Sequence, residues 1–187
     1  MRSSVILALF TFVLGVEARA ETPVLRCAAP FADVLSDRVF GRYAVTAPSS
    51  TLKPATPDVR AGTAHLYRTV IREGAKKGPD FAGHYTIIRI GCGAATVCVA
   101  IADAQSGKVY FPPQLEEATA LQVDTGGTDV DTLNYRRDSR LLIVIGSPNE
   151  KSARAGVSYY RWRSGKLSLI QFIPAAKFCS LPVSTQF

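Results

Sequence analysis

The strongest constraint on the fold of this chain is a series of short runs of β-branched and aromatic residues that begins at Tyr85. Glycines and polar turns separate the runs, which cover residues 85–90, 97–103, 109–111, 133–135, 141–145, 157–163 and 167–173. Strands joined by such short turns must pair antiparallel. The first three runs therefore predict a meander and the last four predict two hairpins. Propeller-like blades are the lesser alternative, because three hairpins are too few to close a propeller.

Two segments that precede the strands have apolar residues at the helical spacing of three and four. They cover residues 31–40 and 63–73, and a proline-containing segment that we expect to be extended lies between them. The second helix would begin at Thr63, a capping residue, and end before Gly74, which can adopt a left-handed conformation. Together these patterns predict an α+β fold of antiparallel hairpins and a meander, with one or two N-terminal helices packed on the sheet.

The first twenty residues predict export from the cell. Arg2 precedes an apolar run over residues 5–16, and the small-x-small cleavage signal follows at residues 18–20. The run is shorter than the roughly 20 residues of a membrane-spanning helix, and no later apolar segment reaches that length. We therefore expect residues 1–20 to be a signal peptide, residues 21–187 to form one periplasmic or secreted domain, and the chain to have no transmembrane segment.

The cysteine content is typical of a protein with disulfide bonds. All four cysteines follow the predicted signal peptide, and an even number in an exported protein allows three connectivities. We predict a bond between Cys92 and Cys98, which would close a tight loop between two adjacent strands. We predict a second bond between Cys27 and Cys179, which would join the two ends of the domain.

The charge of the chain indicates the kind of partner it would bind. The formal net charge is +7, and loss of Arg2, Glu17 and Arg19 with the signal peptide leaves +6. A basic excess favours an anionic envelope component or an acidic protein as partner, whereas a solvated basic surface with no partner is the alternative. Export argues against nucleic acid as a partner, and the oligomeric state stays open.

The best candidate binding surface is a cluster of arginines near the C-terminus. Tyr159, Arg161 and Arg163 would share one exposed face of a strand, because strand faces alternate. Arg136 and Arg140 lie on the preceding hairpin, and adjacent hairpins would bring all five residues together. Guanidinium groups suit carboxylates and phosphates, while a solvent-facing row of arginines is the simpler interpretation.

The middle of the sequence carries a recurrent set of short motifs. The chain contains Gly-Pro-Asp-Phe-Ala-Gly-His-Tyr at residues 78–85, Gly-Cys-Gly at 91–93, Cys98 and Gly-Lys-Val-Tyr at 107–110. Over roughly residues 63–172 it resembles a family of small secreted bacterial proteins of unknown function. The resemblance implies an exported protein and supplies no activity.

The alternative to a binding module is a cell-wall-modifying or thiol-dependent enzyme. In that hypothesis Cys92 is the nucleophile and His84 is its base, with Asp80 or Tyr85 orienting the histidine. A disulfide at Cys92 and a structural hydrogen bond at His84 explain the same residues more simply. Catalytic function is therefore uncertain, and we favour a non-enzymatic module.

A metal site is the remaining possibility. Asp124, Asp129 and Asp131 surround a glycine pair and could bind calcium, but their spacing does not match an EF-hand and no glutamate closes the loop. The histidines, His65 and His84, lack the spacing of a zinc site. We therefore expect neither a metal ion nor a cofactor.

Overall fold

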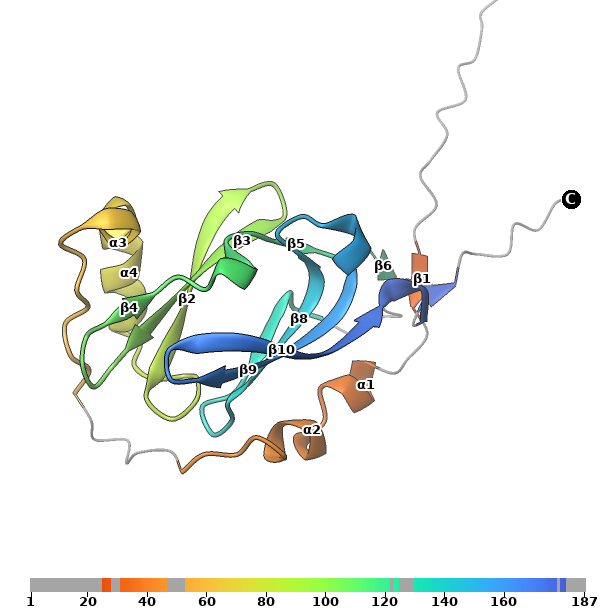
Figure 1. Ribbon diagram of the computed structural model, residues 1–187, viewed down its shortest axis with the longest axis horizontal. Coiled ribbons are helices and arrows are strands. Elements are labelled where there is room, and N and C mark those ends of the chain that lie inside the picture. Colours follow the sequence, from red (N-terminus) through yellow and green to blue (C-terminus); the bar gives the residue numbers. More distant parts are fainter. Residues whose placement is uncertain are drawn as a thin grey trace, which may run out of the picture.

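The computed structural model describes residues 25–27, 31–46, 53–121, 123–124, 130–177 and 179–180. The predicted signal peptide and its cleavage site lie outside these residues. Figure 1 shows a strongly curved sheet, with helices at two separate places on its outside.

The main sheet has eight strands, and each of its pairings is antiparallel. In the order β10-β9-β8-β5-β3-β2 the strands cover Lys166–Pro174, Gly156–Arg163, Leu141–Pro148, Ala118–Ala120, Thr96–Asp103 and Tyr85–Gly93. Two short strands add to it, as β4 (Val109–Tyr110) pairs with β3 and β7 (Leu133–Tyr135) pairs with β8. The predicted meander and both predicted hairpins are confirmed.

A second, three-stranded sheet joins distant parts of the chain. Its strands are β1 (Leu25–Cys27), β6 (Val123–Asp124) and β11 (Cys179–Ser180), and β1 is parallel to β6 but antiparallel to β11. The β1–β11 register places Cys27 directly opposite Cys179. The backbone thus brings together the two cysteines that we predict to be bonded, and the bond itself stays a prediction.

The helices confirm the α+β class, although each predicted helix is divided in two. The first segment forms α1 (Phe31–Val34) and α2 (Asp37–Gly41), and the second forms α3 (Gly62–Leu66) and α4 (Arg68–Ala75). Short 3₁₀ helices follow as η1 (Pro113–Leu115), η2 (Ser152–Arg154) and η3 (Ala175–Lys177). Tyr67 interrupts the second segment, because its φ of −100° and ψ of 20° depart from helical values.

Gly74 has a different role from the one predicted. It lies inside α4, where an added Cβ would be 2.9 Å from Cγ1 of Ile88 on β2. Glycine at this position lets the helix pack closely on the sheet. The left-handed residue that follows the helix is Gly78, with a φ of +82°.

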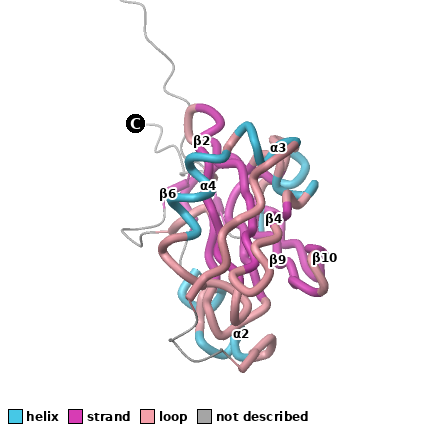
Figure 2. Tube along the Cα trace, turned by 90° about the vertical axis from the view of Figure 1, so that its left-hand side faces the viewer, coloured by secondary structure: helices cyan, strands magenta, loops and turns pink. Residues whose placement is uncertain are grey.

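The curved sheet produces three hydrophobic clusters, because alternate residues of a strand point to opposite faces. The inner face holds a cluster that includes Leu142, Val144, Tyr160 and Trp162. On the outer face of β8 and β9, α1 and α2 cover a second cluster, and on the outer face of β2 and β3, α4 covers a third. The two helical layers are apart in both views (Figures 1 and 2).

The Gly-Pro-Asp-Phe-Ala-Gly-His-Tyr stretch at residues 78–85 forms the loop that closes the sheet before β2. The side chain of Phe81 is fully buried in the inner cluster. The next residues bond to the hairpin between β7 and β8, where the N–H of Gly83 donates to the carbonyl of Arg137 at 2.6 Å. Gly83 has a φ of +90°, which favours glycine. The motif therefore has a structural role.

Candidate binding surface

Two of the predicted binding residues, Arg161 and Arg163, are exposed on β9. Their neighbours Tyr160 and Trp162 point to the inner face and are only 2% and 1% exposed, so the predicted alternation is present. Across the turn, Lys166 of β10 is the register partner of Arg163 and is exposed as well. We call Arg161, Arg163 and Lys166 the cationic hairpin.

The cationic hairpin has no acidic partner within the described part of the chain. The sequence contains a signal for this that the prediction missed. From Lys151 to Phe187 it carries six basic residues and no aspartate or glutamate. The positive charge of the hairpin is therefore neutralised neither by its cross-strand neighbours nor by the segments that adjoin it.

Tyr159 is a correction to the predicted surface, because it is buried and only 7% exposed. It shares the outer face of β9 with Arg161, but it packs into the cluster that contains Val34 and Phe40 of the first two helices. Burial also raises the pKa of its hydroxyl. Strand alternation predicts which side chains share a face, but it does not predict which part of that face a helix covers.

The guanidinium of Arg136 is held against the N-terminal helices. It forms an ion pair with Asp37 of α2 and donates to the carbonyl of Leu35 at 3.2 Å. Its Cζ lies 4.4 Å from the centre of the Phe40 ring. These contacts hold Arg136 against the segment of α1 and α2.

Arg140 is exposed but belongs to the other face of the sheet. Its carbonyl accepts a hydrogen bond from the Trp162 N–H at 2.8 Å, so it lies opposite Trp162. Burial raises the pKa of Tyr85 on the inner face, and the charge of Arg140 acts against that shift. Alternation therefore separates Arg140 from Arg161, and the five predicted binding residues do not form one surface.

A basic cleft that the sequence did not suggest lies beside Tyr160. Its volume is about 240 Å³, and its lining includes Gln114, Lys151, Arg154 and Tyr160. Lys151 and Arg154 are exposed. Burial raises the pKa of Tyr160, and the positive charge of Arg154 acts to lower it. Gln114 is fixed by a bond from its Nε2 to the carbonyl of Leu167 at 3.1 Å. We call this the Lys151–Arg154 cleft.

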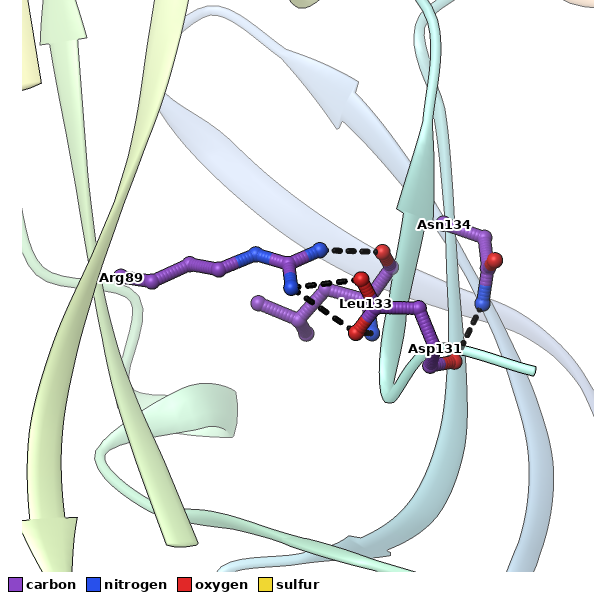
Figure 3. A network of polar contacts seen from close by, with 4 residues as sticks. All are labelled: Arg89, Asp131, Leu133 and Asn134. Atoms are coloured by element: carbon purple, nitrogen blue, oxygen red, sulfur yellow. Dashed lines mark hydrogen bonds and ion pairs between the residues drawn. The ribbon is translucent and has the colours of Figure 1, made fainter. Parts of the chain in front are cut away.

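A network of polar contacts ties β2 to β7 (Figure 3). Nη1 of Arg89 donates to the two carboxylate oxygens of Asp131 at 2.8 and 2.6 Å, and Nη2 donates to the carbonyl of Leu133 at 2.7 Å. Asn134 Nδ2 donates to the carbonyl of Asp131 at 2.6 Å. Arg89 thus closes the seam between two strands that are not paired with each other.

A buried carboxyl group lies beside this network. Burial raises the pKa of Asp80 to about 6, although a hydrogen bond from the Ile87 N–H and the charge of Arg89 lower it. Burial raises the pKa of Tyr135 too, and the charge of Asp80 adds to that shift. Perturbed groups of this kind are common in catalytic sites, but they also occur in structural networks. Because Asp131 and Leu133 accept the hydrogen bonds of Arg89, we interpret this network as structural.

The alternative in which His84 acts as base for Cys92 does not fit the geometry of these residues. Cys92 is bonded to Cys98 with a Cα–Cα distance of 5.8 Å, as the sequence predicted. His84 precedes the first residue of β2 and Cys92 is near its other end, so about 25 Å of extended chain separates them. A residue at one end of a strand cannot act as base for a nucleophile at the other end.

His84 lies beside Asp103 and beside Tyr85, one of the two residues named as able to orient it. Its Nε2 lies 3.7 Å from Oδ1 of Asp103, and its ring centre is 4.3 Å from that of Tyr85. Asp103 is also the acceptor for the N–H groups of Gln105 and Ser106 in the turn after β3. His84 therefore packs against a turn, which fits the structural interpretation.

The predicted aspartate cluster can be followed only in part. The Asp131 carboxylate binds Arg89, whereas the side chains of Asp124 and Asp129 lie outside the described residues. Among the described residues, no group of three potential metal-ligating side chains is present. No helix in the described part of the chain is long and apolar enough to cross a membrane.

Comparisons with known proteins add no family or function. A scan against protein-family models, a search of curated proteins and a search of solved structures all give no match.

Proposed function

We propose that this protein is a non-enzymatic binding module of the bacterial cell envelope that contacts an anionic envelope component or an acidic protein. The observation that carries the proposal is the cationic hairpin, whose three exposed cations lie in a segment of sequence with no acidic residue. The planar guanidinium groups of Arg161 and Arg163 suit bidentate contacts with carboxylate, phosphate or sulfate.

The position of the hairpin supports this role. Tyr160 and Trp162 alternate with the two arginines along β9. Their side chains are buried in the inner cluster and hold the strand in place. A firmly held strand presents its charged groups at a fixed spacing, which lowers the entropic cost of binding. The envelope location in the proposal rests on the predicted signal peptide.

Catalysis by a cysteine nucleophile has no support in this arrangement. Cys92 is held in a disulfide, and Nε2 of His84 lies 3.7 Å from the turn carboxylate of Asp103. We therefore do not include a thiol-dependent reaction in the proposed function.

The proposal is tested by capture from a periplasmic extract and by titration with purified wall and lipid polymers. We expect the double variant Arg161→Ala, Arg163→Ala to bind about tenfold more weakly than the wild type. The control is Arg68→Ala, Arg72→Ala on α4, which removes the same charge from two other exposed residues and should bind like the wild type. Equal binding by both double variants would contradict the proposal, as would turnover of a wall polymer that is lost in His84→Ala.

A further inference from the structure

We propose that the partner is an acidic polypeptide segment that binds in extended form along the edge of β10 and places one carboxylate in the Lys151–Arg154 cleft. This inference rests on the proposed function and names the class of partner.

The first observation is that β10 is an edge strand. It is the last strand of the main sheet, and within the described residues it pairs with β9 alone. The carbonyl of Leu167 points away from β9, because it accepts a bond from Gln114. Leu169 follows two residues later in the same register, so its N–H and carbonyl also point outward. Such groups are a template for another strand.

The second observation is the apolar character of this edge. Leu169 and Ile170 are 39% and 38% exposed, and with Leu66 they are the large exposed hydrophobic residues of the described chain. From Leu167 to Ala176 the sequence has no charged residue. Natural edge strands usually carry charges, prolines or bulges that prevent pairing, whereas β10 has Lys166 and Pro174 only at its ends and a register shift between Leu169 and Gln171. An added strand would cover both apolar side chains.

The third observation is that the Lys151–Arg154 cleft adjoins the same edge. Tyr160 lines the cleft and is the register partner of Leu169. Gln114 lines the cleft and binds the carbonyl of Leu167. In Figure 2, β10 lies at the outer edge of the molecule. A side chain of a strand added to β10 could therefore reach the two cations of the cleft.

Charge decides between the possible occupants of this edge. A second copy of this chain would bring another cationic hairpin to the same region, and like charges would repel. A polymer without amide groups could neutralise the cations but could not pair with the outward N–H and carbonyl groups of Leu169. An acidic polypeptide satisfies the backbone, the apolar residues and the cations together.

The test uses three probes with the mature protein in calorimetric titrations. The first is an end-blocked peptide of about ten residues in which glutamate alternates with threonine, long enough to cover one strand. The second is the same peptide with alternate backbone amides methylated, so that its charge is kept but its pairing edge is blocked. The third is dextran sulfate, which has negative charges and no amide groups.

We expect the methylated peptide to bind at least about tenfold more weakly than the unmodified peptide, because its backbone hydrogen bonds are lost. Leu169→Pro should weaken binding of the unmodified peptide by about tenfold and leave binding of dextran sulfate within about twofold, since it removes an outward N–H and an exposed apolar side chain but no charge. The double variant Lys151→Ala, Arg154→Ala should also weaken binding of the unmodified peptide by about tenfold.

Equal binding of the methylated and unmodified peptides would overturn the inference that a strand adds to β10, and it would leave the proposed binding of an anionic partner intact. A dimer in sedimentation experiments that Leu169→Pro converts to monomer would also overturn it, because a second copy would then occupy the edge. Failure of the wild type to bind any of the three probes would contradict both the inference and the proposed function.

Discussion

Arg89 of β2 binds the carboxylate of Asp131 across the seam of the sheet, with Nη1 2.8 and 2.6 Å from the two oxygens. Its other terminal nitrogen binds the carbonyl of Leu133 in β7. A single side chain therefore joins two strands that have no backbone pairing between them. This contact, together with the loop around Phe81, closes the curved sheet around its inner cluster.

Loss of this contact should destabilise the fold. We expect Arg89→Ala to lower the free energy of unfolding by about 1–2 kcal/mol, because both a charge-assisted bond to a carbonyl and a partly exposed ion pair are lost. Urea unfolding measures the change. Lys76→Ala is the control, since its exposed ion pair with Glu73 should contribute less than about 0.5 kcal/mol. Equal effects of the two substitutions would contradict a closing role for Arg89.

Asp80 should make stability depend on pH. Because burial raises its pKa from 3.8 to about 6, the folded protein holds this proton more tightly than the unfolded chain. The contribution of Asp80 to stability is therefore full below about pH 4 and is lost as the pH rises through about 6. Asp80→Asn cannot ionise and keeps an oxygen to accept the Ile87 N–H.

Relative to the wild type, the free energy of unfolding of Asp80→Asn should thus increase by about 2–3 kcal/mol between about pH 4 and about pH 7. Urea unfolding across this range tests the expectation. Parallel stability profiles for the two proteins would show that the carboxyl of Asp80 does not titrate as inferred.

Peptide mapping without reduction should show two linked pairs, Cys92 with Cys98 and Cys27 with Cys179. The first pair is bonded in the structure, and the backbone register places the second pair opposite each other. In the chain-entropy model the short loop contributes about 2 kcal/mol and the long loop about 5 kcal/mol. Linkage of Cys27 to Cys92 or Cys98 would contradict this arrangement.

Gly74→Ala should destabilise the protein, although alanine is the better helix former. The added Cβ would lie 2.9 Å from Cγ1 of Ile88, which α4 and β2 hold in place. We expect a loss of about 1–3 kcal/mol in the free energy of unfolding. Gly41→Ala at the end of α2 is the matched control, because an added Cβ there meets nothing within 4 Å. A stabilising effect at Gly74 would show that α4 can move away from the sheet.

Much of the fold could be predicted from local signals. The β-branched runs and their polar turns indicated the positions of the main strands in the sequence and the antiparallel pairing of neighbours, and the spacing of Cys92 and Cys98 indicated their bond. The short strands β1, β5, β6 and β11 were missed, because strands of two or three residues have no periodicity to detect. The equally short β4 and β7 were predicted only from the polar turns beside them.

The candidate surface was harder to predict, because it depends on tertiary packing. The alternation of side chains along a strand correctly predicted that Arg161 and Trp162 lie on opposite faces of β9. The burial of Tyr159, however, depends on where α1 and α2 lie. The position of Arg136 depends on Asp37, a residue 99 positions away in the chain. The edge of β10 and the Lys151–Arg154 cleft likewise result from the order of the strands, which the sequence pattern does not specify.

The most direct test of the proposed binding surface is a titration of the isotope-labelled mature protein with dextran sulfate, followed by amide chemical shifts. The cationic hairpin predicts that the largest shift changes fall on residues 161–166, and that they disappear in the Arg161→Ala, Arg163→Ala variant. Shift changes that are centred on α4 or on the Arg89 network, and that persist in this variant, would contradict the account.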